Sequence, residues 1–453
     1  MASLPHPIHR VPPEVLSEIL IQGTPLRYTS ISERSSIISP SHVCRDWRSV
    51  ALSTPSLWTF ILFRCPRDEF LPRELDCIHA WLSRSGRCAL TITTHSYRSR
   101  HSKAPIEPFI PHCMRWREID TRIFSAVNPH VTSQIKGNMP LLESADLGFV
   151  ESHTLIDLFA VAPRLRRLKL ENCSPFELDL VTLPWAQLVH LDIETDTEPS
   201  FLRLLVLAAN VTFLNVTICH GFDTNIGITH PNILTMHATT SSSTLTDDLL
   251  DRLALPALRD LRLVDPGWRT ASFISRSACT LSSLQIGMFE TSKFVELMEL
   301  LPALQELSVT FRWAYEWEAM AECLAFQHNL RLAPDLRSLT MRWPCWPPAK
   351  YVEDISLHSF AIMLASRWTP LGAVPDATSI RSPLNHVRVD RCVSTKIVES
   401  TSALVCLQRL LKEGLDVTLL TDDNPPRDLL AARTIYELDA GHIMPFLRLA
   451  DTS

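Results

Sequence analysis

The sequence has 453 residues, 46% of them hydrophobic, and a net charge of −6 from 43 basic and 49 acidic residues. This apolar content is typical of a globular protein, and the lack of excess positive charge argues against a nucleic-acid partner. No segment has the pattern of a signal peptide or a membrane-spanning helix, and the twelve cysteines form no CxxC pair. We therefore expect reduced thiols, no membrane partner, and a cytoplasmic or nuclear location, or both.

Residues 8–60 predict a small all-helical module built from two amphipathic stretches. The first is VPPEVLSEILI from Val11, which carries two prolines in its first turn, where a missing N–H costs nothing. Its apolar residues form two i, i+4 pairs that we place on one helix face: Val15 with Ile19, and Leu16 with Leu20. So few apolar positions make a marginal core, so this module is expected to leave an apolar face for a partner.

The second stretch, SPSHVCRDWRSVALSTPSLW from Ser39, puts Val43, Trp47 and Val50 on one stripe. Together and in this order, the two segments resemble the F-box, the adaptor-binding module of cullin–RING ubiquitin ligases, especially in fungal families with divergent leucine-rich repeats. The spacer IQGTPLRYTSISERSSIIS is longer and richer in Ser and Thr than the compact module. The resemblance implies adaptor contacts from Val11, Pro12, Pro13, Glu14, Leu16, Ile19, Leu20, Val43, Cys44, Trp47, Leu57 and Trp58.

Residues 61–139 are predicted to form a linker of helix and strand that contains degenerate first repeats. The segments AWLSRSGRCALTI from Ala80 and HCMRWREI from His112 resemble the first helix, strand and degenerate repeat that follow the F-box in the fungal group.

A pattern of three apolar residues, spaced L-x-x-L-x-L, recurs through residues 140–425 at intervals near the leucine-rich-repeat period. Its first positions are Leu142, Leu165, Leu188, Val211, Ile233, Leu258, Leu281, Leu304, Leu336 and Leu384. Because alternate strand residues face opposite sides, the second and third apolar positions enter one core. Helical segments between copies, such as SFLRLLVLAAN and SKFVELMELL, complete each unit.

The predicted fold class is thus an α/β solenoid: an F-box, then a leucine-rich-repeat horseshoe of ten to thirteen units with parallel strands inside and helices outside. A degenerate unit built on SLHSFAIMLASRW is expected before Leu384, and residues 426–453 form a C-terminal cap or tail. Cys173, Cys219 and Cys392 occupy the repeat position usually taken by Asn or Cys, so we expect their side chains to be buried.

The residue between the second and third apolar positions should project from the exposed, concave face of the sheet. In chain order these residues are Asp146, Lys169, Asp192, Asn215, His237, Arg262, Gln285, Ser308, Thr340 and Arg388. We expect the substrate on this face, with Lys169, Arg262 and Arg388 among its contacts.

Met288, Phe311 and Trp343 follow three consecutive copies at one position and could form an apolar strip at the rim of that face. The alternative is that they pack beneath the insertion FRWAYEWEAMAECLAFQHN.

No catalytic motif, phosphate-binding loop or metal-ligand spacing stands out, so we expect neither enzyme activity nor a cofactor nor a metal.

The resemblance implies the substrate-recognition subunit of an SCF-type ligase, bound to the adaptor, through it to the cullin, and to an unidentified substrate protein. Two alternatives stay open. One is a non-ligase interaction scaffold, in which the first helix could merely cap the solenoid; the other is an enzyme with an unrecognised site.

Overall fold

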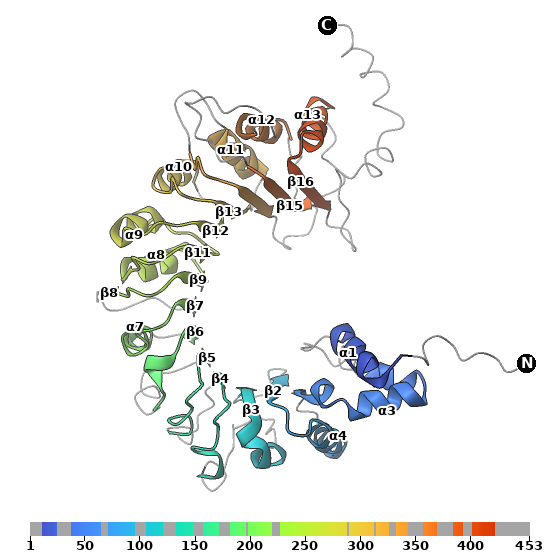
Figure 1. Cartoon of the computed structure of the whole chain (residues 1–453). Coiled ribbons are helices and arrows are strands. Elements are labelled where there is room, and N and C mark those ends of the chain that lie inside the picture. The colour runs from blue at the N-terminus through green and yellow to red at the C-terminus, as the bar shows by residue number, and fades with distance from the viewer. Residues whose placement is uncertain are drawn as a thin grey trace, which may run out of the picture. The chain divides into compact units, whose positions relative to one another are not determined.

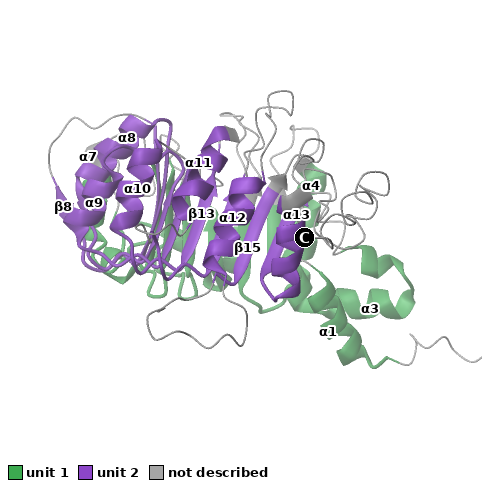
Figure 2. Cartoon of the chain, turned by 90° about the horizontal axis from the view of Figure 1, so that it is seen from above, with its two compact units in different colours: residues 1–211 green, residues 212–453 purple. Residues whose placement is uncertain are grey.

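The structure is a computed structural model, in which the chain divides into two compact units, residues 1–211 (unit 1) and 212–453 (unit 2) (Figure 2). The structure describes residues 11–24, 38–64, 71–95, 106–120, 133–148, 157–171, 182–195, 198–219, 227–287, 290–311, 314–325, 332–342, 357–368, 384–392 and 401–421. The boundary between the units falls inside the predicted solenoid.

Unit 1 opens with short helices and continues as a parallel sheet in the order β1-β2-β3-β4-β5-β6 (Figure 1). Pro13 begins the first helix, as the sequence predicts. The elements are α1 (Pro13–Gly23), η2 (Ser39–His42), α3 (Arg45–Ser53), η3 (Pro55–Trp58), β1 (Phe60–Arg64), α4 (Leu71–Arg84), β2 (Leu90–His95), η5 (Glu107–Arg115), β3 (Trp116–Asp120), β4 (Ser144–Gly148), β5 (Arg167–Glu171), η8 (Trp185–Gln187), β6 (His190–Thr195) and α7 (Glu198–Leu207).

Unit 2 is a run of strand–helix repeats whose strands pair in parallel in the order β7-β9-β11-β12-β13-β14-β15-β16, with α8–α13 on one side of the sheet (Figure 1). A separate parallel pair joins β8 and β10. The elements are β7 (Phe213–Ile218), β8 (Ile228–Thr229), β9 (Thr235–Thr240), α8 (Ser243–Asp251), β10 (Leu253–Ala254), β11 (Asp260–Leu263), α9 (Thr270–Ser277), β12 (Ser283–Gly287), α10 (Thr291–Glu299), β13 (Glu306–Thr310), α11 (Ala314–Leu324), β14 (Ser338–Arg342), α12 (His358–Arg367), β15 (His386–Cys392), α13 (Thr401–Lys412) and β16 (Asp416–Thr421).

The repeat register predicted from the sequence is confirmed. All ten first apolar positions are buried, and so are the second and third positions of every copy, such as Leu284 and Ile286 in β12 or Leu307 and Val309 in β13. Neighbouring copies pair at equivalent residues. The architecture is therefore that of an α/β solenoid with leucine-rich-type repeats. Strands β1, β2, β3 and β16 add repeats outside the ten copies.

Two long intervals between copies contain helices rather than extra repeats. The insertion after Phe311 supplies α11, which follows β13. SLHSFAIMLASRW supplies α12, and because β14 pairs directly with β15, no additional strand lies between them. The prediction of a separate degenerate unit there is wrong, since the segment is the helix of the repeat that begins at Leu336.

The cysteine prediction is wrong for Cys219, whose side chain is exposed. Strand β7 extends to Ile218, which is buried, so strand alternation turns the next side chain away from the core. Cys173 lies outside the described residues, and the structure describes only the backbone of Cys392.

The buried side chain of Arg367 joins the end of α12 to the end of α11 and to the segment before β14. Arg367 at the end of α12 is 3% exposed and donates hydrogen bonds to the carbonyl oxygens of Leu324 (2.6 Å), Ala333 (3.0 Å) and Leu332. Leu324 ends α11, and Ala333 has a positive φ of 44°. Burial lowers the pKa of Arg367 to about 10, so the guanidinium stays charged at neutral pH and keeps donating to these carbonyl groups.

We expect Arg367→Met to destabilise unit 2 by about 3 kcal/mol or more, because it leaves buried carbonyl groups without their donor. Urea denaturation followed by tryptophan fluorescence measures this loss, since Trp317 is buried in α11 beside α12. Arg409→Met is the matched control, because Arg409 is exposed on α13 and forms an ion pair with Glu413 on the same surface. Equal stability of the two variants would contradict this role.

Candidate functional site

The opening helices of unit 1 pack on one another and, through Trp58, on Trp81 of α4. Leu16 and Leu20 of α1 are each 4% exposed, and Ala51, Leu57 and Trp58 from α3 and η3 are buried with them. The indole of Trp58 donates to the carbonyl of Ala51 at 2.9 Å, and the hydroxyl groups of Ser17 and Thr54 are 3.0 Å apart. The first contact joins η3 to α3, and the second joins α1 to the residue between them.

The two i, i+4 pairs of α1 face different ways, so their placement on one face is wrong. Leu16 and Leu20 face the core, whereas Val15 and Ile19 are each 49% exposed. Adjacent residues differ by about 100° around a helix, and α3 covers only one of the two pairs. An apolar surface therefore remains on α1. Val43, just before α3, is another exposed aliphatic side chain of the module, 60% exposed.

The remaining predicted adaptor contacts fall into three groups. Leu16, Leu20, Leu57 and Trp58 are core residues, so their contribution is to hold the module together. Pro12, Pro13 and Glu14 are exposed, and Val11, Cys44 and Trp47 are half-buried. The indole nitrogen of Trp47 is shielded and has no hydrogen-bond partner among the described residues. Val15 is the exposed residue that the prediction of adaptor contacts omitted.

The predicted row of outward residues exists in both units. In unit 1, Asp146 pairs in register with Lys169, and Lys169 with Asp192. Lys169 forms ion pairs with Asp146 (3.5 Å) and Glu171, so its charge is neutralised within the sheet face. A lysine between acids on three sides is poorly suited to bind an anionic partner, which weakens Lys169 as a substrate contact.

In unit 2 the row continues strand by strand in the order that the sequence predicts. The register pairs Asn215 with His237, His237 with Arg262, and so on through Gln285, Ser308 and Thr340 to Arg388. Burial alternates along each strand, so these side chains lie on the face opposite the core residues. The structure therefore places Arg262 and Arg388 on one face, four strands apart.

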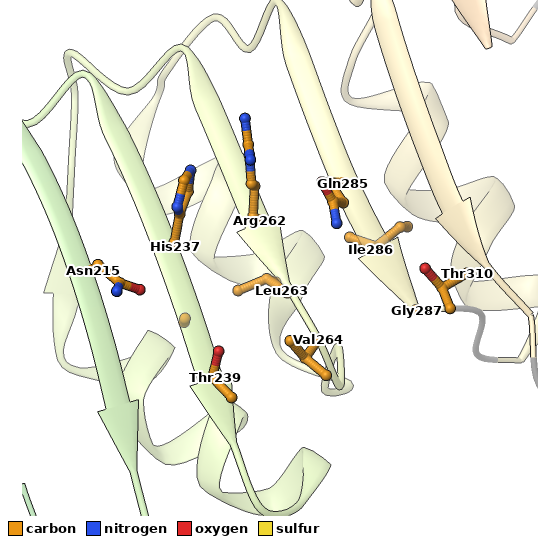
Figure 3. A pocket seen from close by; sticks show the side chains of 11 residues that line it. Asn215, His237, Thr239, Arg262, Leu263, Val264, Gln285, Ile286, Gly287 and Thr310 are labelled. Carbon is orange, nitrogen blue, oxygen red and sulfur yellow. The ribbon is translucent and has the colours of Figure 1, made fainter. Parts of the chain in front are cut away.

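A pocket of about 250 Å³ lies on this face over β7, β9, β11, β12 and β13 (Figure 3). The side chains of His237 and Arg262 rise side by side from neighbouring strands, with Gln285 on the next (Figure 3). Arg262 forms an ion pair with Asp260, with 3.6 Å between Nη2 of Arg262 and Oδ2 of Asp260. The ring of His237 packs edge-on against Phe213. The residues that line the pocket include one arginine and no acid.

Gly287 lines one end of this pocket, where the backbone of Val264 approaches it closely. A Cβ atom at this position would lie 2.5 Å from the carbonyl oxygen of Val264 and 3.3 Å from Pro266, so no side chain fits without moving the backbone after β11. Val264 itself is exposed and lines the pocket. The glycine thus permits the close approach that shapes the pocket edge.

Next to the pocket, two arginines share one aspartate across neighbouring strands. The Nε atoms of Arg342 and Arg388 lie 3.4 Å and 2.6 Å from the two carboxylate oxygens of Asp390. Residue Arg342 pairs in register with Asp390, and it follows Thr310 of the pocket in the same row. Arg342 and Asp390 were missed because only the middle row was considered, although residues two positions apart share a strand face.

The apolar strip is not supported at its described member. Phe311 is fully buried and packs on Trp317 of α11, with ring centroids 5.8 Å apart, so it is not available as an exposed contact. Phe311 thus follows the alternative stated above, in which it packs beneath the insertion that forms α11. Met288 and Trp343 lie outside the described residues. The prediction of Phe311 as a substrate contact is therefore wrong.

Chemical sites of other kinds do not emerge from the described residues. Within them, no group of three or more His, Cys, Asp or Glu side chains is arranged to hold a metal ion. The helices that the structure describes are all too short or too polar to cross a bilayer.

Comparison with known proteins gives no family assignment. No family model matches the sequence, and no curated protein matches it either. Among solved structures, the chain is similar to the leucine-rich repeat-containing protein LegL7 from Legionella pneumophila, with 13% identity and a TM-score of 0.36 over 76% of this chain and 97% of that one. At this level the likeness carries no argument about function.

We expect Gly287→Ala to destabilise unit 2 by about 1–3 kcal/mol, because the added methyl group forces the backbone at Val264 to shift. Thermal unfolding measures the loss. Gly227→Ala is the matched control, since the nearest atom to its new Cβ would be 3.8 Å away, an ordinary contact. A Gly287→Ala variant as stable as the control would contradict this reading of the pocket edge.

Proposed function

We propose that this protein is the substrate-recognition subunit of an SCF-type cullin–RING ubiquitin ligase, with residues 8–60 acting as an F-box. The observation that carries the proposal is the exposed aliphatic surface of Val15, Ile19 and Val43 on a helical module whose sequence resembles an F-box. Leu16 and Leu20 supply the buried contacts of α1, so these three exposed side chains are not part of the core. An exposed apolar surface of this kind marks a site for a partner protein.

In this proposal the module binds the adaptor, and through it the cullin, while the exposed sheet face of unit 2 binds the substrate protein. The chain itself is non-catalytic, because ubiquitin transfer belongs to other subunits of the ligase, and it needs neither a metal nor a cofactor. The ligase would operate in the cytoplasm, the nucleus or both.

The repeat architecture by itself suits a protein-interaction scaffold. Rows of polar side chains in register across many strands offer a long surface whose residues can vary without altering the core. A scaffold outside any ligase would use the same face but would not require the adaptor. Copurification with the cullin distinguishes the two functions.

The variant that tests adaptor binding must alter exposed residues of α1. Substituting Leu16 would disrupt the core of the module, so its loss of binding would not be informative. Val15→Asp with Ile19→Asp instead alters only exposed positions of α1. Burial of each large apolar side chain contributes roughly 1.5–3 kcal/mol, so we expect adaptor affinity to fall at least tenfold in a pull-down or titration.

Val206→Asp with Leu207→Asp is the matched control, because it places two acids on an exposed apolar pair at the end of α7, away from the module. This control should bind the adaptor as the unaltered protein does. Full adaptor binding by the Val15 and Ile19 variant, or its equal loss in both variants, would refute the assignment of the adaptor site to α1.

A further inference from the structure

We propose that Arg342 and Arg388 form a clamp for a carboxylate side chain, so that unit 2 recognises an acidic, unphosphorylated segment of its protein partner. This inference deepens the proposed function, on which it rests for the identity of that partner as a substrate. The clamp comprises Arg342 at the end of β14 and Arg388 and Asp390 on the outward face of β15.

The geometry leaves most of each guanidinium available. Asp390 engages the Nε atoms of Arg342 and Arg388, and the Nη atoms of both have no hydrogen-bond partner among the described residues. The two side chains remain 43% and 48% exposed. An arginine carries five N–H donors in a planar fork, so each retains the paired donors that bind a carboxylate through two parallel hydrogen bonds.

Buried neighbours fix the position of the clamp. The backbone N–H of Phe311 donates to the carbonyl of Arg342 at 2.9 Å, and the ring of Phe311 is locked against Trp317. Asp390 forms an ion pair with each guanidinium, so both side chains are oriented before a ligand binds. This pre-organisation reduces the entropy lost on binding, which is the main cost for long, flexible side chains.

The net charge of the clamp favours a carboxylate over a phosphate. Two guanidiniums and one carboxylate sum to one positive charge, which a single Asp or Glu side chain neutralises. A phosphoserine carries a charge of about −1.5 to −2, so it would overcompensate beside Asp390. Like charges at short range disfavour that complex.

The surroundings favour a peptide rather than a small anion. Thr310, which pairs in register with Arg342, also lines the pocket that contains Arg262 and Gln285. Clamp and pocket are therefore continuous along one face. A segment that places an acidic side chain in the clamp can extend its neighbouring residues over the amide, hydroxyl and guanidinium groups of the pocket.

The test uses the purified full chain and three immobilised peptide pools with random flanking residues and a fixed central Glu, Gln or phosphoserine. We expect the Glu pool to retain about tenfold more protein than the isosteric Gln pool, since charge-assisted hydrogen bonds are lost in the latter. Arg342→Gln with Arg388→Gln should abolish this preference. Arg269→Gln with Arg409→Gln is the matched control, because it removes two exposed arginines from elsewhere in unit 2.

Asp390→Asn tests the charge argument directly. It raises the net charge of the clamp by one, so the ratio of phosphoserine to Glu binding should increase. Equal binding of the Glu and Gln pools, stronger binding of phosphoserine by the unaltered protein, or a ratio unchanged by Asp390→Asn would overturn the proposal. Adaptor capture by the same preparations is measured in parallel: its failure alongside a Glu preference refutes the ligase function and leaves the clamp standing.

Discussion

The in-register pairing of parallel strands is the constraint on which the rest of this protein depends. Each copy places its three apolar residues against those of the next copy, as Leu284 and Ile286 do with Leu307 and Val309. A slip of one residue would turn every core side chain to the solvent face. The apolar core thus fixes the strand register. The order of the outward side chains follows from that register and does not determine it.

This separation explains how one architecture can carry a specific surface. Inward positions are confined to apolar residues of suitable volume, whereas outward positions tolerate Asn215, Arg262 or Thr340 alike. The acidic surroundings of Lys169 in unit 1 and the arginine pair in unit 2 both occupy such outward positions, so neither is required by the core. The same division holds in the opening module, where Leu16 is buried in the core and Ile19 is exposed.

The periodicity of the sequence predicted the strands and their outward rows, which depend on local pattern. It did not predict the burial of side chains whose environment is set by an element distant in the sequence. The spacing of Leu142, Leu165 and the later copies sufficed to give the strands and their outward row. The sequence could not tell whether Val15 or Leu16 faces inward, because both lie in i, i+4 pairs and the choice is made by α3. Likewise, Phe311 became a core residue only because α11 supplies Trp317, and the length of β7 determined the exposure of Cys219.

The most direct test of this account is the distance between spin labels placed along the middle row of unit 2. One label replaces Asn215, and the second replaces Gln285, Ser308 or Thr340 in separate variants; these lie three, four and five strands away. With parallel strands about 4.8 Å apart, the distance should lengthen in near-equal steps, from about 14 Å to about 24 Å. Distances that do not increase with strand number would contradict the register. They would also contradict the surface of unit 2 on which substrate binding and the carboxylate clamp are proposed.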